Sequence, residues 1–269
     1  TGYNLGIDNM NLYQRKLGLG ELTGVEIYES DGTLAGPDEK EDWYGGDTIM
    51  AAIGQSDNLI TPVQLATYAA TIANNGTRLR THVVDKITDY SRQTVLEETK
   101  PEVVEENIFD QEVLETVKGA MRNVVTSPSG TGYYSYGSYE IPIAAKTGTA
   151  QTYLPNSNEY DVDNITLIAY APYDDPQIAI GIVVEYGGGG ARAGNLVADI
   201  ANAYFAMQDG TLNEDGTIGK QETAADRTPA DQTAPAQTET GTDTATDPAA
   251  GTTDAAQETA PAGQDDLDN

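Results

Sequence analysis

Apolar side chains recur at helical spacing in four segments between residues 7 and 207. An apolar repeat of about three to four residues places these groups on one face of a helix, so the pattern predicts helices over 7–17, 62–74, 111–124 and 193–207. The side chains expected to face the core are Ile7, Met10, Tyr13 and Leu17 in the first helix, Leu65, Tyr68, Ala69, Ile72 and Ala73 in the second, Val113, Leu114, Val117, Met121 and Val124 in the third, and Leu196, Val197, Ile200, Ala201 and Tyr204 in the last.

Two of these helices carry a recognisable start residue, and one of the two also has a stop signal. Thr61 and Asp110 stand where an N-cap side chain accepts hydrogen bonds from free backbone N–H groups, and Pro62 suits the first helical position. Asn75 and Gly76 can adopt the left-handed conformation that ends a helix. The second helix is therefore the best defined in the sequence.

Three apolar runs, 141–152, 165–170 and 178–184, indicate strands. A Pro- and Asp-rich stretch, 172–176, separates the last two and is typical of the tight turn in an antiparallel hairpin. The nearly continuous apolar character of the runs indicates strands that are covered on both faces. We therefore predict an α+β fold of three layers, an antiparallel sheet flanked by helices.

The other segments of the body lack a clear period. Residues 21–48 are rich in Gly, Asp and Glu, which predicts a long surface loop around Trp43 and Tyr44. Residues 82–105 are expected to form strands and turns.

Composition changes sharply at residue 209. The segment 209–269 consists mainly of Thr, Ala, Asp, Gln, Pro and Gly, so it cannot form a core and we expect a disordered acidic tail. Its fourteen acidic residues against Lys220 and Arg227 contribute −12 of the formal net charge of −29. The body, 1–208, keeps −17 and is acidic in its own right.

This charge and the residue types present exclude several kinds of function. Nucleic-acid binding and unaided docking on anionic lipid both need basic surfaces. The absence of Cys excludes disulfides and thiolate chemistry, and His82, the single histidine, cannot build a catalytic triad or a multi-histidine zinc site. We therefore expect chemistry without histidine, a metal or a cofactor.

The ends of the chain suggest a segment of a longer protein. No stretch approaches the roughly twenty apolar residues of a membrane span, and no signal peptide opens the chain. Because Thr1 is not an initiator Met, we expect further sequence upstream.

The run 146–151 reads Lys-Thr-Gly-Thr-Ala-Gln and carries the candidate chemistry. Acyl transfer on a peptide with a free carboxylate needs a nearby cation, which Lys146 can supply. Thr147 and Thr149 can donate hydrogen bonds to the same carboxylate, and Gly148 leaves room for a close approach. If this strand lies at the edge of the sheet, an extended peptide can pair with it, and the Thr149 backbone N–H is free to bind an oxyanion. Lys146 and Thr149 are thus candidate catalytic residues, and 147–149 candidate substrate-binding residues.

Several segments together resemble the class B penicillin-binding proteins, the monofunctional peptidoglycan D,D-transpeptidases. The resemblance covers most of 5–207 and lies outside the tail. It rests on 146–151, on Gly-Asp-Thr-Ile-Met-Ala-Ala-Ile-Gly-Gln at 46–55, on Thr-Pro-Val-Gln-Leu at 61–65, on Ala-Asn-Asn-Gly at 73–76, and on Tyr-Ala-Pro-Tyr at 170–173 before the strand 178–185.

The resemblance implies the fold of penicillin-binding proteins and serine β-lactamases, incomplete in this chain, over residues 1–208. It implies cross-linking of cell-wall stem peptides that end in D-Ala-D-Ala, covalent acylation by β-lactams, and partners in cell-wall synthesis such as a glycosyltransferase. It also implies an extracytoplasmic protein held at the cell membrane by an N-terminal anchor outside this chain. Lys146, Thr147 and Thr149 match the carboxylate and oxyanion positions of the family's third motif.

The other two family motifs are not matched in the same way. No Ser has a Lys three residues later, so the Ser-x-x-Lys nucleophile is missing. Ser56, Asp57 and Asn58 spell the second motif, but their place before the Thr61 helix favours a loop with polar turn residues. We expect both motifs upstream of Thr1, and this chain alone to be inactive.

Two alternatives remain open at this point. One is a hydrolase on the same fold, a D,D-carboxypeptidase or β-lactamase, in which water is the acceptor. The other is a non-catalytic penicillin-sensing or scaffold domain that binds cell-wall peptide or partner proteins. The Thr-Ala-Gln ending at 149–151 and the Thr61 helix favour the transpeptidase.

Overall fold

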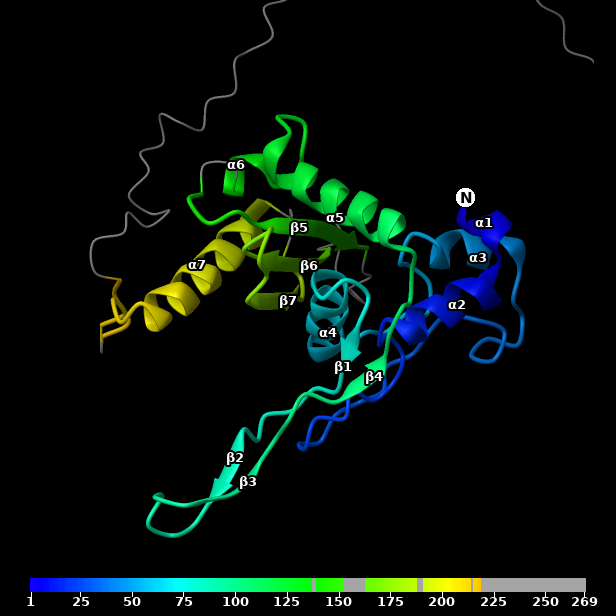
Figure 1. The fold of residues 1–269 in the computed structure, drawn as a ribbon. Helices are drawn as coiled ribbons and strands as arrows, with labels where there is room; N and C mark the ends of the chain where they lie inside the picture. The colour runs from blue at the N-terminus through cyan, green and yellow to red at the C-terminus, as the bar shows by residue number, and fades with distance from the viewer. Residues whose placement is uncertain (137–138, 152–162, 188–190, 214, 219–269) are drawn as a thin grey trace, which may run out of the picture. The chain divides into compact units, whose positions relative to one another are not determined.

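A computed structural model describes residues 1–136, 139–151, 163–187, 191–213 and 215–218. Its central element is a three-stranded antiparallel sheet in the order β5-β6-β7 (Figure 1). The strands are β5 (Ala144–Ala150), β6 (Asn164–Ala171) and β7 (Ile178–Val184). The predicted hairpin of the last two strands is confirmed, and the first strand is shorter than the expected 141–152. The predicted acidic tail lies outside the described residues from 219 onward.

The register of the sheet assigns each side chain of β5 to a face. Ala144 lies opposite Tyr170, and Gly148 lies opposite Thr166, which in turn lies opposite Val183. Because successive strand residues point to opposite faces, Lys146 shares a face with Ala144 and Gly148. Thr147 and Thr149 belong to the other face.

Helices α4 (Pro62–Ala73) and α5 (Gln111–Thr126) cover the Ala144 face (Figure 1). The Thr61 hydroxyl accepts from the Gln64 N–H at 3.3 Å, which confirms the predicted N-cap, and the Gln64 side chain accepts from the Thr61 N–H at 3.0 Å, which completes a capping box. The core on this face contains Ala69, Ile72, Ala73, Met121, Ala144, Ile168 and Tyr170. Burial raises the pKa of the Tyr170 hydroxyl, so this ring stays neutral in the core.

The opposite face is covered by α7 (Ala191–Gln208), with α6 (Tyr133–Tyr136) beside it. Its core contains Val125, Tyr136, Ile143, Ala145, Ile165, Leu167, Ala169, Ala171, Ile180, Val197, Ala198 and Ala201. Helices therefore lie on both faces of an antiparallel sheet, which confirms the predicted three-layer α+β class.

The remaining elements precede the sheet in the chain. Three short helices are α1 (Gly2–Leu5), α2 (Ile7–Lys16) and α3 (Gly45–Ala51). Strand β1 (Arg78–Leu79) pairs with β4 (Val103–Glu105), and β2 (Lys86–Thr88) pairs with β3 (Val95–Glu98). The β2–β3 hairpin projects from these elements as a two-stranded arm (Figure 1). Strands β2, β3 and β4 agree with the strands and turns predicted over 82–105.

The predicted loop over 21–48 was wrong at its end, because α3 already begins at Gly45. The Asp47 carboxylate accepts from the Tyr44 N–H at 2.8 Å and pairs with Lys40 Nζ at 2.6 Å. These bonds, Lys40 first, hold the pKa of Asp47 below its usual value. A carboxylate in the first turn favours a helix, and the sequence reading overlooked this signal.

The predicted inward face of α5 was partly wrong. Leu114 and Met121 are buried, but Val113 and Val117 are exposed, and Asp110 occupies the N-cap position without a side-chain capping bond. The inward stripe instead includes Lys118, which donates to Asn75 Oδ1 at 2.9 Å. A long basic side chain can cover apolar surface with its stem, so the hydrophobic pattern missed this side of the helix.

A similar correction applies to α7. Val197 and Ala201 are buried as predicted, but Leu196 and Ile200 are exposed. Ala198 takes the inward position instead, and a Cβ on Gly194 would lie 2.3 Å from Ser135 Oγ. Gly194 thus lets α7 approach α6 closely, and small residues such as Ala198 and Ala201 take buried positions while the larger Leu196 and Ile200 face outward. In α2, Met10 is buried as predicted, whereas Tyr13 is exposed and stacks on Phe109 with ring centres 5.3 Å apart.

Replacement of Gly181 by Ala should lower the free energy of unfolding by about 2–3 kcal/mol. Gly181 lies on β7 where α4 crosses it, and an added Cβ would be 2.6 Å from the Ala66 N atom and 2.7 Å from the Pro62 carbonyl oxygen. Urea unfolding of the protein that contains this chain measures the change.

Gly119→Ala on α5 is the matched control, because a Cβ there meets no atom within 4 Å apart from the nearby backbone of its own helix. A helical Gly→Ala change should raise stability by up to about 1 kcal/mol. Equal effects of the two substitutions would contradict the close α4–β7 contact.

Candidate active site

Lys146 lies on an edge strand of the sheet. Among the described strands, β5 pairs with β6 alone. The exposed Lys146 ammonium donates to the Thr147 carbonyl, and within the described part of the chain it has no carboxylate partner at ion-pair distance. Its positive charge is therefore open to an incoming anion in a chain whose net charge is −29.

The backbone of Thr149 points away from the sheet. Gln55 Nε2 lies 3.4 Å from the Thr149 carbonyl oxygen, and the Thr147 carbonyl, two residues earlier, accepts from the Lys146 ammonium. A strand residue directs its N–H and C=O to the same side, so the Thr149 N–H also points outward. The edge position on which the sequence-based candidate depends is thus present in the described fold.

Gly148 lies between these residues at a point where a side chain does not fit. A Cβ built on it would be 2.3 Å from Thr166 Oγ1 on the neighbouring strand. The glycine therefore lets Thr166 occupy the surface of the sheet beside Lys146.

A loop hydroxyl fixes the side chain of Thr147. Thr131 Oγ1 and Thr147 Oγ1 lie 2.8 Å apart, a hydrogen bond in which either atom can be the donor. Sequence reasoning missed both Thr131 and Gln55. The available signals were the two glycines that flank Thr131 and the place of Gln55 at the end of the 46–55 segment.

A groove of about 490 Å³ runs along the α4 side of β5, next to Thr149. The sheet contributes Ala150, Asn164, Thr166, Val183 and Glu185 to its lining, α4 contributes Leu65, and the loop before α4 contributes 53–55 and 58–61. The site therefore combines an exposed cation, two threonines on an edge strand and an adjacent groove. This arrangement can hold an extended peptide with a terminal carboxylate.

Comparison with protein families gives a match over residues 1–206 to the transpeptidase domain of penicillin-binding proteins. The chain belongs to this family. A curated relative, peptidoglycan D,D-transpeptidase MrdA of Haemophilus influenzae, is 32% identical over 225 residues, covering 77% of this chain and 34% of that protein. The chain spans about a third of the length of such relatives.

Solved structures of penicillin-binding proteins show the same fold. Penicillin-binding protein 2B of Streptococcus pneumoniae is 27% identical, with a TM-score of 0.66 over 77% of this chain and 33% of that chain. A Helicobacter pylori complex of PBP2 with MreC gives 27% identity and a TM-score of 0.63, over 77% of this chain and 37% of that chain. The fold predicted by resemblance is therefore confirmed.

In this transpeptidase domain, Asn58 holds two loops together. Its Oδ1 accepts from the Ala35 N–H at 2.9 Å, and its Nδ2 donates to the Gln55 carbonyl at 2.9 Å. Ser56 Oγ lies 3.3 Å from Asp57 Oδ2. These bonds agree with the interpretation of 56–58 as a structural loop. They also hold the loop in a position where Gln55 Nε2 lies 3.4 Å from the Thr149 carbonyl oxygen of the edge strand.

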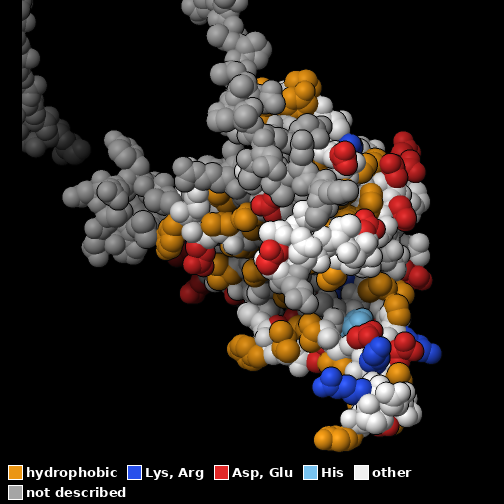
Figure 2. Space-filling model, turned by 90° about the vertical axis from the view of Figure 1, so that its left-hand side faces the viewer, with side chains coloured by type: hydrophobic (Ala, Val, Ile, Leu, Met, Phe, Trp, Pro, Cys, Tyr) orange, Lys and Arg blue, Asp and Glu red, His pale blue; other side chains and the backbone are white. Residues whose placement is uncertain are grey.

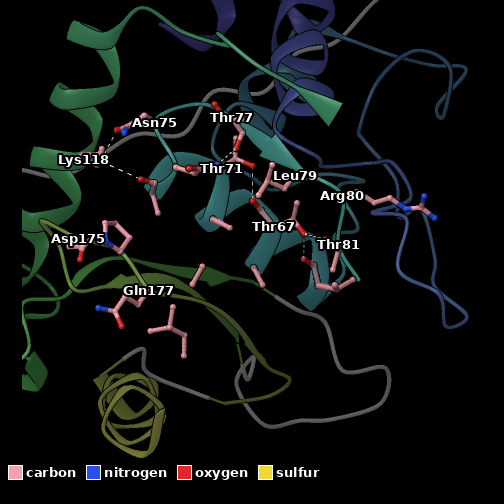
Figure 3. Close-up of a pocket in the computed structure, with 18 of the residues that line it drawn as sticks. Thr67, Thr71, Asn75, Thr77, Leu79, Arg80, Thr81, Lys118, Asp175 and Gln177 are labelled. Atoms are coloured by element: carbon pink, nitrogen blue, oxygen red, sulfur yellow. Dashed lines mark hydrogen bonds between the residues drawn. The ribbon is translucent and has the colours of Figure 1, made fainter. Parts of the chain in front are cut away.

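A larger hollow, about 690 Å³, lies at the opposite end of the sheet, between α4, β1 and the turn before β7 (Figure 3). Its polar groups bond one another: Thr67 and Thr81 hydroxyls lie 3.0 Å apart, and Arg80 points away to donate to the Gly24 carbonyl at 3.1 Å. Lys146 does not line this hollow, whose sheet residues 178 and 179 pair with the end of β6 that faces Ala144.

Charged side chains are unevenly distributed over the transpeptidase domain. Figure 2 shows acidic groups scattered over the face in view, whereas most of the Lys and Arg side chains visible there lie at its lower end, near the β2–β3 arm. Within the described residues, no three His, Cys, Asp or Glu side chains come together as a metal site. The helices of the described part include none that is long and apolar enough to span a membrane.

Replacement of Gly148 by Ala should destabilise the protein by about 1–3 kcal/mol, because the new methyl group collides with Thr166 Oγ1. Thr166→Ala removes the colliding hydroxyl. The double variant should recover most of the lost stability in thermal unfolding, which a double-mutant cycle quantifies. Additive effects would show that the collision is not with Thr166.

Proposed function

We propose that the protein containing this chain is a peptidoglycan D,D-transpeptidase. The observation that carries the proposal is the edge strand of a penicillin-binding domain, with the Lys146 ammonium exposed and the Thr149 N–H directed outward. Relatives at 30% and 32% identity carry the name peptidoglycan D,D-transpeptidase MrdA.

The proposed reaction proceeds through an acyl-serine intermediate. A serine of the whole protein, upstream of this chain, attacks the carbonyl of the penultimate D-Ala, and the terminal D-Ala leaves with a proton on its amine. The amine of a second stem peptide then attacks the ester, which forms the cross-link and returns the serine. The groove beside Thr149, lined from α4 and the sheet, is the place we propose for the upstream segment and the peptide.

The residues of this chain bind and polarise the donor peptide in this proposal. Lys146 and the two threonines leave opposite faces of β5, but the Lys146 ammonium reaches the outer edge at the Thr147 carbonyl. At this edge we place the terminal carboxylate, held by the charge of Lys146 and by hydroxyl donors of Thr147 and Thr149. The Thr149 N–H contributes to the oxyanion site, where a preorganised donor stabilises negative charge as it develops. Gly148 keeps the strand accessible. β-Lactams, which carry a carboxylate and a reactive carbonyl, would bind the same edge.

The proposal extends to location and partners. Cross-linking of cell-wall peptides takes place outside the cytoplasm, so we propose an extracytoplasmic protein anchored at the cell membrane by an upstream segment. A glycosyltransferase that makes the glycan strands is the expected partner. We place the end of the transpeptidase portion at 208, supported by the end of α7 at Gln208 and the family match through 206.

Lys146→Ala in the full-length protein should slow acylation by a fluorescent penicillin about 10- to 100-fold, the effect of a lost hydrogen bond to a charged group. Second-order acylation rates from gel fluorescence measure this effect. Lys86→Ala is the control, because it removes the same charge from the exposed β2 strand and should leave acylation unchanged. A wild-type rate of labelling for Lys146→Ala would contradict the role proposed for this ammonium.

The reaction type is tested with a donor stem peptide and an acceptor amine. A transpeptidase gives a cross-linked product as well as free D-Ala. Release of D-Ala with no cross-link would identify a hydrolase instead. No acylation and no turnover by the wild-type protein would leave a scaffold or penicillin-sensing role.

A further inference from the structure

The loop between α5 and α6 brings one hydroxyl to the edge strand. Thr131 is exposed and its Oγ1 lies 2.8 Å from Thr147 Oγ1, although the residues are 16 positions apart in sequence. Nearby, Ser127 Oγ and Ser129 Oγ bond each other at 3.0 Å. The loop thus directs one of its hydroxyl groups to β5.

The shape of this loop depends on two glycines that flank Thr131. A Cβ on Gly130 would lie 2.2 Å from the Val124 carbonyl oxygen, and one on Gly132 would lie 2.8 Å from the Tyr136 ring. The Gly132 N–H donates to the same Val124 carbonyl at 3.0 Å. Close packing on the end of α5 therefore fixes Thr131 over Thr147.

We propose that Thr131 is a positioning residue that orients the Thr147 hydroxyl toward a ligand carboxylate, an inference that rests on the proposed function. A carboxylate accepts hydrogen bonds and has no proton to donate, and a hydroxyl has a single proton. When Thr147 donates to the carboxylate, its oxygen is left as an acceptor. Thr131 must then donate to Thr147, so the two hydroxyls and the carboxylate form one directed chain.

This series of hydrogen bonds lets the loop that carries Thr131 influence which ligands bind. A bound ligand displaces water from the exposed hydroxyl pair, and hydrogen bonds strengthen when water is excluded. In a series of bonds, each polarises the next, so the Thr131 bond strengthens the donation from Thr147 to the carboxylate. Ligands without a negative carboxylate gain less, because a neutral acceptor forms weaker hydrogen bonds than a charged one.

The experiment compares Thr131→Val, Thr131→Ser and Ser129→Ala in the full-length protein. Val keeps the shape of Thr and lacks the hydroxyl, Ser keeps the hydroxyl, and Ser129 bonds within the loop. We expect Thr131→Val to slow acylation by benzylpenicillin about three- to tenfold. The Ser variant and Ser129→Ala should acylate at the wild-type rate, with melting temperatures unchanged.

Two further readouts separate positioning from a structural effect. In a Thr147→Val background, Thr131→Val should cause no further loss. With benzylpenicillin methyl ester, which lacks the negative carboxylate, the ratio of wild-type to Thr131→Val rates should fall toward one. Equal losses in the Val and Ser variants, or wild-type acylation by Thr131→Val, would overturn the inference. A wild-type protein that penicillin does not acylate would overturn the proposed function and, with it, this inference.

Discussion

The close contact of α4 with β7 at Gly181 is the constraint on which the site depends. Backbone atoms of Pro62 and Ala66 lie so near Gly181 that a Cβ would meet them at 2.7 and 2.6 Å. This contact fixes the start of α4, and with it the loop over 53–61 that precedes it. Because that loop lines the groove and carries Gln55 to the Thr149 carbonyl, the distance between helix and sheet sets the geometry beside Lys146.

Successive residues of a strand point in opposite directions, so the residues of the Lys-Thr-Gly-Thr run are oriented differently. Lys146 and Gly148 lie on the α4 face, while Thr147 and Thr149 direct their carbonyls outward from the edge. A shift of the register by one residue would exchange these roles, because the period of a strand is two. The unbroken pairing of seven residues between β5 and β6 fixes that register. The chemistry of the run therefore depends on sheet pairing as much as on residue type.

The family assignment and the geometry of the edge strand are independent observations that support the same proposal. The family match covers 1–206, whereas the chain spans about a third of the length of its curated relatives. What the described residues provide is an edge strand with an exposed lysine and a groove beside it. A nucleophile with its base belongs to the rest of the protein in our proposal, so activity is a property of the assembled domain.

The sequence by itself determined the local elements and the candidate strand. The Thr61 N-cap, the 178–184 strand with its hairpin and the 146–149 motif all rest on neighbouring residues, and local periodicity and hydrogen bonding encode such features. Tertiary structure decided which sides of α5 and α7 face the core, since Lys118 and small residues lie there. It also decided the contacts of Gln55 with Thr149, 94 positions apart, and of Thr131 with Thr147. Such pairs meet only after helices and sheet have packed, so the local signals near Gln55 and Thr131 could not identify their partners.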